Sequence, residues 1–310
     1  MPYRILCFDG GGVRGVYTAR LLERLLAHVP ALLSAADLLA GTSTGGLMAL
    51  GLAAGHSPAT LVTLYHDHAP RIFDRSWTRD LATLDGLAGA EYDNQHLKHL
   101  VDGFFGTTRL EQLTKRVLIP SFQLDNQAPH AGQRQWKPKF FHNYPGPDSD
   151  GAELVVDVAM RTSAAPIYFP TYQSYIDGGV VANDPSMAAL AQALDPDSGR
   201  QRLEDLHVCS LGTGTNPVYI PGHDLDWGLA HWAKPLVSLM IDGVMGVAEY
   251  QCAHLLGDRY FRLQPRLPKP IALDDAAATG DLITYADQVD LTAAVAWLNA
   301  HFPPPASTAV

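Results

Sequence analysis

The first fifty residues alternate short apolar runs with stretches of helical periodicity. Residues 4–8 (RILCF) have the length and apolarity of a buried strand and end at glycines. Leucines at helical spacing then predict a helix that starts near Val13 and is stopped by Pro30. A second strand-like run, 37–40, precedes a small-residue apolar helix over 46–54. This order predicts a parallel sheet covered by helices, with ligands at the carboxyl ends of the strands.

The rest of the chain continues the alternation. Apolar runs predict further strands at 117–124, 140–144, 172–176, 206–211 and 260–263. Helical patterns follow Ser57-Pro58 toward Arg71 and then cover 155–162, 186–194, 234–256 and 292–301. The polar stretch 80–106 carries helical fragments, and we expect it to cover part of a pocket. No repeat or linker interrupts the pattern, which predicts a single domain over residues 1–302 and a disordered, proline-rich tail at 303–310.

Composition narrows the class of partner. The chain has 310 residues, 47% of them hydrophobic, and a formal net charge of −10. This charge argues against nucleic acid and against tight docking on anionic lipid, but it allows weak hydrophobic contact with a membrane. Three widely spaced cysteines, Cys7, Cys209 and Cys252, predict neither a disulfide framework nor a zinc site. With no signal peptide and no apolar run long enough to span a bilayer, we expect a soluble cytoplasmic protein with transient peripheral membrane contact.

A serine lies between the second predicted strand and the helix after it. Residues 41–45 read GTSTG, a G-x-S-x-G motif in which Gly41 and Gly45 flank Ser43. A serine on such a tight turn exposes its hydroxyl above the sheet, and the flanking glycines let neighbouring backbone pass without a clash. The helix that follows directs its positive N-terminal end toward the same place. The context therefore predicts Ser43 as a nucleophile.

The first strand ends in a loop with two interpretations. Gly10, Gly12 and Gly15 satisfy G-x-G-x-x-G, which is typical of dinucleotide sites. Such a site needs an acidic residue at the end of the second strand, but Asp37 begins that strand and Ser43 follows its end. No G-K-[ST] follows the glycines either. A glycine loop beside a serine turn instead suits acyl transfer, which needs backbone N–H donors near the developing oxyanion.

A serine nucleophile also needs a base. Histidines at several positions fit a Ser–Asp–His order, although none lies in a diagnostic motif: His207, His223, His231, His254 and His301. The other candidate is Asp177, which ends an apolar run and precedes Gly178 and Gly179. These glycines allow close backbone approach. The residues themselves leave the choice between a dyad and a triad open.

Taken together, these motifs resemble the patatin-like phospholipase family. DGGGVRG (9–15) is similar to the family's oxyanion loop, GTSTGG (41–46) to its nucleophile turn, and DGG (177–179) to the motif of its catalytic aspartate. Other blocks also follow the family's order and spacing: RTSAAPIYFP (161–170), Asn183 to Ser186, and SLGTG (210–214). The resemblance covers about residues 4–215.

This resemblance implies a three-layer α/β fold, related to the α/β-hydrolases, with a mostly parallel central sheet flanked by helices. It also implies a Ser43–Asp177 dyad without a catalytic histidine. We expect burial to raise the pKa of Asp177 toward the working range of a base. We expect the oxyanion to be held by the backbone N–H groups of Gly10, Gly11 and Gly12. Arg14 lies nearby in the sequence and is expected to assist them.

The predicted function is that of a serine lipid acyl hydrolase, of phospholipase A or lysophospholipase type, that forms an acyl-enzyme intermediate. We expect a lipid or phospholipid substrate as the partner of the protein, and no metal and no cofactor. Two alternatives remain on the sequence alone. One is a nucleotide-binding or dinucleotide-binding protein that uses the G-x-G-x-x-G loop, and the other is a non-catalytic storage or interaction protein on the patatin-like scaffold.

Overall fold

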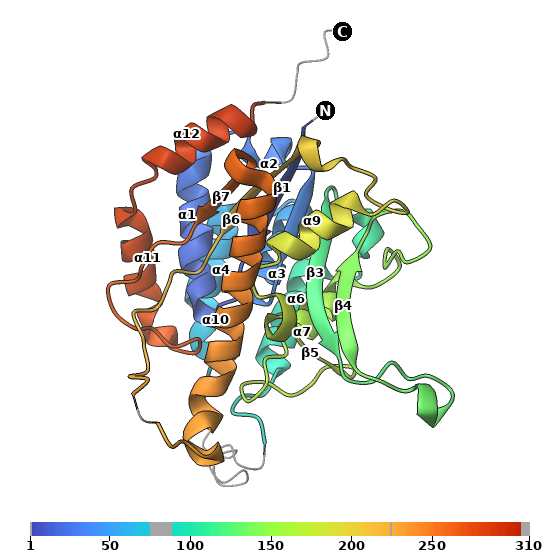
Figure 1. Cartoon of the computed structure of the whole chain (residues 1–310), viewed down its shortest axis with the longest axis vertical. Coiled ribbons are helices and arrows are strands. Elements are labelled where there is room, and N and C mark those ends of the chain that lie inside the picture. The colour runs from blue at the N-terminus through green and yellow to red at the C-terminus, as the bar shows by residue number, and fades with distance from the viewer. Residues whose placement is uncertain (1, 75–88, 224, 305–310) are drawn as a thin grey trace.

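The described strands form one mixed sheet at the centre of the molecule (Figure 1). The computed structural model describes residues 2–74, 89–223 and 225–304. The strands follow the order β4-β3-β2-β1-β6-β7, with β5 also paired to β3. Neighbours from β3 through β7 are parallel, whereas β4 and β5 run antiparallel to β3. The bounds are β1 Tyr3–Phe8, β2 Leu38–Gly41, β3 Arg116–Gln123, β4 Lys137–His142, β5 Tyr175–Asp177, β6 Leu206–Leu211 and β7 Tyr260–Leu263.

Helices cover both faces of this sheet, which confirms the predicted three-layer α/β fold. One face carries α1 (Gly15–His28), α2 (Leu32–Ala35), α3 (Thr44–Ala53), α4 (Pro58–Ile72), α6 (Gln95–Phe105), α7 (Val155–Thr162), α11 (Thr279–Gln288) and α12 (Thr292–His301). The other face carries α8 (Gly179–Ala182), α9 (Ser186–Leu194) and α10 (Leu229–Leu256), which lie in front of the sheet in Figure 1.

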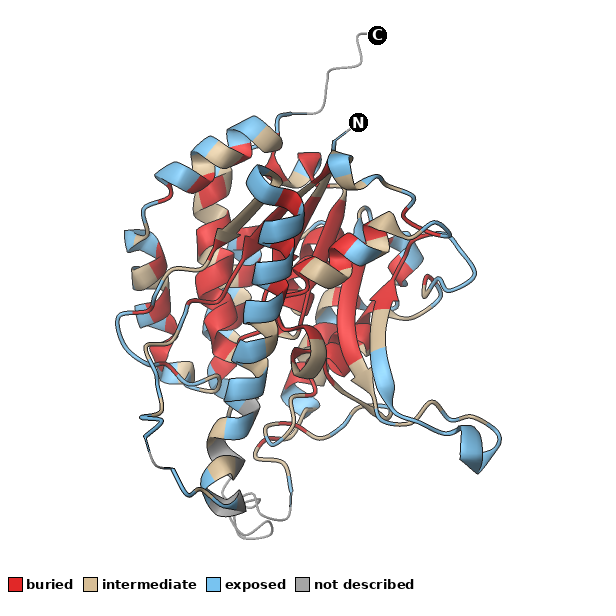
Figure 2. Cartoon of the chain, viewed as in Figure 1, coloured by how far each residue is buried: buried red, intermediate tan, exposed pale blue. Residues whose placement is uncertain are grey.

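The central strand β1 serves both cores. Leu6 and Phe8 pack into the larger core beneath α1 and α3, whereas Ile5 and Cys7 pack into the smaller core beneath α9. All four side chains are fully buried, and Figure 2 colours the buried residues of the central sheet red. A strand covered on both faces has no solvated side, so it reads as a continuous apolar run instead of an alternating one.

Strand register decides which loops meet. In the parallel pair of β1 and β2, Phe8 stands opposite Gly41, so the glycine loop and the serine turn leave the sheet side by side. In the antiparallel pair of β3 and β5, Ser121 stands opposite Asp177. Because β3 is the next strand after β2, the end of β5 lies near the same edge. Residues 10–12, 43 and 177 are therefore brought together from three segments of the chain.

A buried ion pair holds Asp9, the residue that precedes the glycine loop. Arg262 on β7 places Nη1 2.8 Å from Asp9 Oδ1 and contacts Asp9 Oδ2 through Nη2. The same Nη1 lies 2.6 Å from Ser210 Oγ on the intervening strand β6 and 3.5 Å from Asp184 Oδ2. The pKa of Asp9 is raised to about 7, because burial and the nearby Asp184 carboxylate raise it by more than the Arg262 guanidinium lowers it. Two carboxylates thus share one guanidinium across three strands.

Most predicted elements agree with the structure, and the differences have local causes. The strand expected at 172–176 is only Tyr175–Asp177, because Gln173 and Ser174 take φ values of 49° and 65° and turn the chain. The helix expected from 234 begins at Leu229, ahead of Pro235.

Three of the described helices were not predicted. Helices α2 and α8 have four residues each, and α11 buries few apolar side chains, so their patterns are weak. Residues 80–88 of the stretch 80–106 and residues 305–310 of the tail lie outside the described residues.

We expect Arg262→Met to lower the free energy of unfolding by about 3–5 kcal/mol, because the change leaves buried carboxylates without a counter-charge. Urea denaturation monitored by circular dichroism measures this. The matched control is Lys269→Met, which removes an ion pair to Asp281 whose side chains are 54% and 51% exposed, and we expect little effect. Similar losses for both variants would contradict a structural role for the buried pair.

Candidate active site

Ser43 lies on a strained turn between β2 and α3. Its φ of 55° and ψ of −123° are unfavourable for a residue with a side chain, and α3 begins immediately after it at Thr44. A Cβ on Gly45 would lie 2.2 Å from the Phe8 carbonyl oxygen, and one on Gly41 would lie 2.0 Å from the Gly45 carbonyl oxygen. The glycines that flank Ser43 therefore permit the close backbone passage that the motif predicts.

Hydrogen bonds to three other elements hold this turn in place. The Ser43 N–H donates to Thr162 Oγ1 on α7 at 2.9 Å, and the Tyr65 hydroxyl on α4 donates to the Thr44 carbonyl at 2.6 Å. Thr42 Oγ1 donates to the Ala182 carbonyl of α8 at 2.5 Å. Each hydrogen bond contributes about 1 kcal/mol, so together they offset the strain of the turn.

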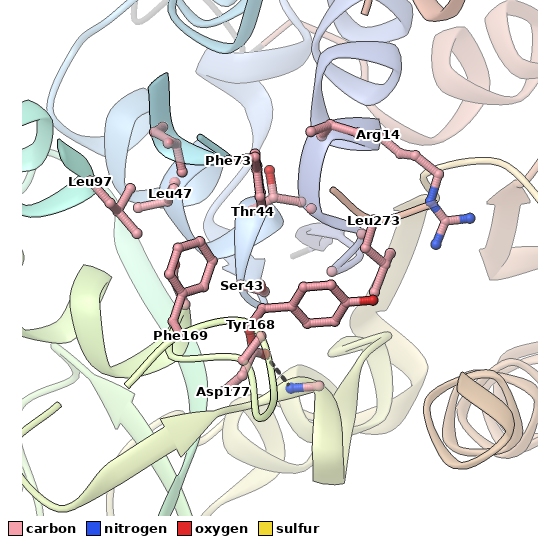
Figure 3. Close-up of a pocket in the computed structure, with 18 of the residues that line it drawn as sticks. Arg14, Ser43, Thr44, Leu47, Phe73, Leu97, Tyr168, Phe169, Asp177 and Leu273 are labelled. Atoms are coloured by element: carbon pink, nitrogen blue, oxygen red, sulfur yellow. Dashed lines mark hydrogen bonds between the residues drawn. The ribbon is translucent and has the colours of Figure 1, made fainter. Parts of the chain in front are cut away.

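Asp177 is the last residue of β5 and is buried beside the cavity that Ser43 lines. Burial raises the pKa of its carboxyl from 3.8 to about 6, as the sequence analysis expected. Two hydrogen-bonding groups oppose this rise: the Ser43 side chain and the Gly179 N–H, which lies 2.7 Å from Asp177 Oδ1. The Gly179 contact is the dashed line in Figure 3. Asp177 thus combines access to Ser43 with the pKa that a base needs near neutral pH.

The glycine loop offers two of the three predicted N–H donors. The Gly10 N–H donates to the Asn183 carbonyl at 3.0 Å, so it is not available to an oxyanion. Within the described residues, the N–H groups of Gly11 and Gly12 have no acceptor. Both residues line the cavity with Ser43. The loop continues through the 3-10 turn Gly12–Arg14 into α1 at Gly15.

Arg14 lines the same cavity, and its guanidinium is directed toward the loop after β6. Its side chain is buried, Nη1 donates to the Gly214 carbonyl at 3.2 Å, and burial lowers the pKa of its guanidinium. In Figure 3 the guanidinium extends away from Ser43. This geometry makes Arg14 a brace between the start of α1 and the loop after β6.

An apolar cavity opens above Ser43 and Asp177. Tyr65, Ile72 and Phe73, from α4 and the residue after it, line one side of the cavity. Further apolar side chains complete the wall: Leu47, Leu97, Tyr168, Phe169, Ile241 and Leu273 (Figure 3 labels most of them). Tyr168 and Phe169 belong to the quoted RTSAAPIYFP block, whereas Leu97, Ile241 and Leu273 carried no local signal.

The histidine candidates lie elsewhere. Among the described residues, no histidine lines this cavity. His207 and His301 contact each other through Nδ1 atoms 2.8 Å apart, and His207 pairs with Arg4 near the amino ends of β1 and β6. His223, His231 and His254 are exposed. Asp37, the acid that a dinucleotide site would require, accepts the Arg4 N–H at the amino end of β1, whereas the cavity lies at the carboxyl end.

Comparison with known proteins shows which family the chain resembles. The family model described as patatin-like phospholipase matches residues 6–190, more than half of the chain. A cGAMP-activated phospholipase of Pseudomonas aeruginosa is 32% identical, with 92% of this chain and 86% of the relative covered. Protein teg of Priestia megaterium is 30% identical over 97% of this chain and 99% of its own.

Among solved structures, VipD of Legionella pneumophila has a TM-score of 0.39 at 11% identity, covering 92% of this chain and 67% of its own. The segment that the patatin-like phospholipase model matches, residues 6–190, contains the glycine loop, the turn of Ser43 and the buried Asp177. The chain therefore belongs to the patatin-like phospholipase family, a family of lipid acyl hydrolases.

Proposed function

We propose that the chain hydrolyses fatty acyl esters of phospholipids or lysophospholipids through a Ser43–Asp177 dyad. The observation that carries this proposal is the pairing of Ser43, on a strained turn, with a buried carboxyl whose pKa is about 6. The cavity wall supports it further, because no histidine among the described residues is in position to serve as the base.

In acylation, Ser43 Oγ attacks the ester carbonyl carbon while Asp177 accepts the hydroxyl proton. The carbonyl oxygen then carries the negative charge of a tetrahedral intermediate, which the Gly11 and Gly12 N–H groups stabilise. When the intermediate collapses, Asp177 returns the proton to the leaving oxygen. An alcohol or lysolipid departs and an acyl-Ser43 ester remains.

In deacylation, Asp177 takes a proton from a water molecule that attacks the acyl-Ser43 carbonyl. The same two N–H groups hold the second oxyanion, and the fatty acid leaves as Ser43 recovers its proton. The apolar cavity supports an acyl chain as the substrate part nearest the dyad, because Leu47, Phe73 and Phe169 offer hydrocarbon surface to it.

We expect a fluorophosphonate ester probe to label the wild-type chain at Ser43 and to leave Ser43→Ala unlabelled. The probe requires an activated serine, so it tests the nucleophile without a guess at the substrate. Labelling is followed by gel fluorescence and by mass spectrometry of the modified peptide. Asp177→Asn removes the base at constant size, and we expect labelling to slow by at least about 100-fold.

The control for this experiment is Ser163→Ala, which removes another buried serine hydroxyl that lines the same cavity. We expect that variant to be labelled at the wild-type rate. Labelling of Ser43→Ala at any other serine, or full-rate labelling of Asp177→Asn, would refute the dyad.

The raised pKa of Asp177 predicts the pH dependence. Asp177 acts as a base only when it is deprotonated, so kcat/KM on a short-chain soluble ester falls as the pH drops through about 6. Above that pH the rate reaches a plateau. Melting temperatures recorded over the same pH range separate titration of the site from unfolding. An inflection near the ordinary aspartate value of about 4 would contradict burial of the working base.

We also propose that lipid enters from a membrane surface against which the cavity rim rests. Ile167 is 48% exposed between the lining residues Pro166 and Tyr168. Exposed apolar side chains next to the cavity lose their hydration when they enter the interfacial region of a bilayer. Within the described residues, no helix has both the length and the apolarity required to cross a membrane.

We expect Ile167→Asn to reduce hydrolysis of zwitterionic phospholipid vesicles several-fold and to leave hydrolysis of a short-chain soluble ester unchanged. The matched control is Leu255→Asn, a similarly exposed apolar position near the end of α10 that does not line the cavity. For this control, vesicle hydrolysis should stay at the wild-type rate. Equal losses for both variants would argue against a membrane contact at the rim.

A further inference from the structure

The Gly10 carbonyl is held by two buried side chains from distant parts of the chain. Asn183 Nδ2 donates to the Gly10 oxygen at 3.2 Å, and Thr213 Oγ1 donates to the same oxygen at 3.2 Å. Asn183 is 4% exposed and Thr213 is 1% exposed. Asn183 follows α8, whereas Thr213 follows β6, so the two donors reach Gly10 from different elements.

Asn183 also holds the other side of Gly10. Its backbone carbonyl accepts the Gly10 N–H at 3.0 Å, so one residue binds Gly10 through both main chain and side chain. The fit is close, because a Cβ on Gly10 would lie 2.2 Å from Asn183 Oδ1, and one on Gly11 would lie 2.4 Å from Thr213 Oγ1. The loop has no room to rotate as a whole between these two side chains.

The geometry of the peptide unit links the orientation of the Gly10 carbonyl to that of the Gly11 N–H. The Gly10 carbonyl and the Gly11 N–H belong to one planar peptide unit, and the described chain contains no cis peptide bond. In a trans unit the C=O and the N–H point in opposite directions. Fixing the Gly10 oxygen toward Asn183 and Thr213 therefore directs the Gly11 N–H to the opposite side of the loop.

We propose that Asn183 and Thr213 are positioning residues that orient the Gly11 N–H as a donor to the oxyanion. This proposal rests on the proposed nucleophilic role of Ser43, and it adds two residues that act through the Gly10–Gly11 peptide unit. Glycine has the greatest backbone freedom of all residue types, so a run of three glycines needs contacts from other segments to hold a donor in place. Their effect falls on the transition state, where the oxyanion charge develops.

The experiment compares Thr213→Val, which removes the hydroxyl at nearly constant volume, with Asn183→Leu, which removes the amide donor. For each we expect kcat on a short-chain soluble ester to fall about tenfold or more and KM to change less than about twofold, because the lost interaction acts only in the transition state. We also expect the rate of fluorophosphonate labelling to fall in parallel, since the phosphonyl oxygen occupies the same place as the oxyanion.

Two further variants separate positioning from packing. Thr213→Ser keeps the hydroxyl and should restore most of kcat. Thr279→Val removes a comparably buried hydroxyl, which donates to the Ala276 carbonyl on another part of the chain, and should keep wild-type kcat. Melting temperatures identify any variant that fails to fold, and Thr213→Val and Asn183→Leu test the proposal independently.

The outcomes are distinguishable from failure of the proposed function. If the wild-type chain is not labelled at Ser43, the dyad itself is wrong. If the wild type is labelled but Thr213→Val and Asn183→Leu retain wild-type kcat and labelling rate, the positioning role is refuted. A rise in KM alone, or a Thr213→Ser variant as slow as Thr213→Val, would likewise overturn it.

Discussion

The two backbone turns that leave β1 and β2 approach each other so closely that no side chain fits between them. At Gly45 a single added carbon would lie 2.2 Å from the Phe8 carbonyl oxygen and 2.5 Å from that of Asp9. This contact fixes the distance between the nucleophile turn and the glycine loop before any substrate binds. Donors fixed in this way need no reorganisation when charge develops, which is the main requirement for stabilising an oxyanion.

Buried polar side chains maintain that contact and give the edge of the sheet its shape. Thr162 and Tyr65 hold the turn of Ser43, whereas Asn183 and Thr213 hold the loop at Gly10. Each one hydrogen-bonds a backbone group of the turn or the loop, and the Gly10 carbonyl accepts two of these bonds. The strain at Ser43 persists because several elements restrain it at once, and none of these contacts is local in sequence.

Burial has opposite uses for the two aspartates near this edge. Asp9 is compensated by the Arg262 guanidinium, and this ion pair secures the base of the loop. Burial raises the pKa of Asp9 to about 7 even with this cation beside it, and it raises the pKa of Asp177 to about 6, where the Ser43 side chain and the Gly179 N–H stabilise the charged form instead. The first arrangement stabilises structure, and we propose that the second supplies a base whose strength suits neutral pH.

The sequence by itself determined the positions of β1 and β2, the serine turn and the glycine loop, because apolar runs and glycine spacing are local signals. Resemblance to a family, not any local pattern, selected Asp177 over five histidines. Only the tertiary structure decided which N–H groups are free: the Gly10 N–H is taken by Asn183, 173 residues away. It likewise turned Arg14 toward Gly214 and added Leu273 to the cavity wall. Contacts of that kind depend on how distant segments pack, and no periodicity along the chain records them.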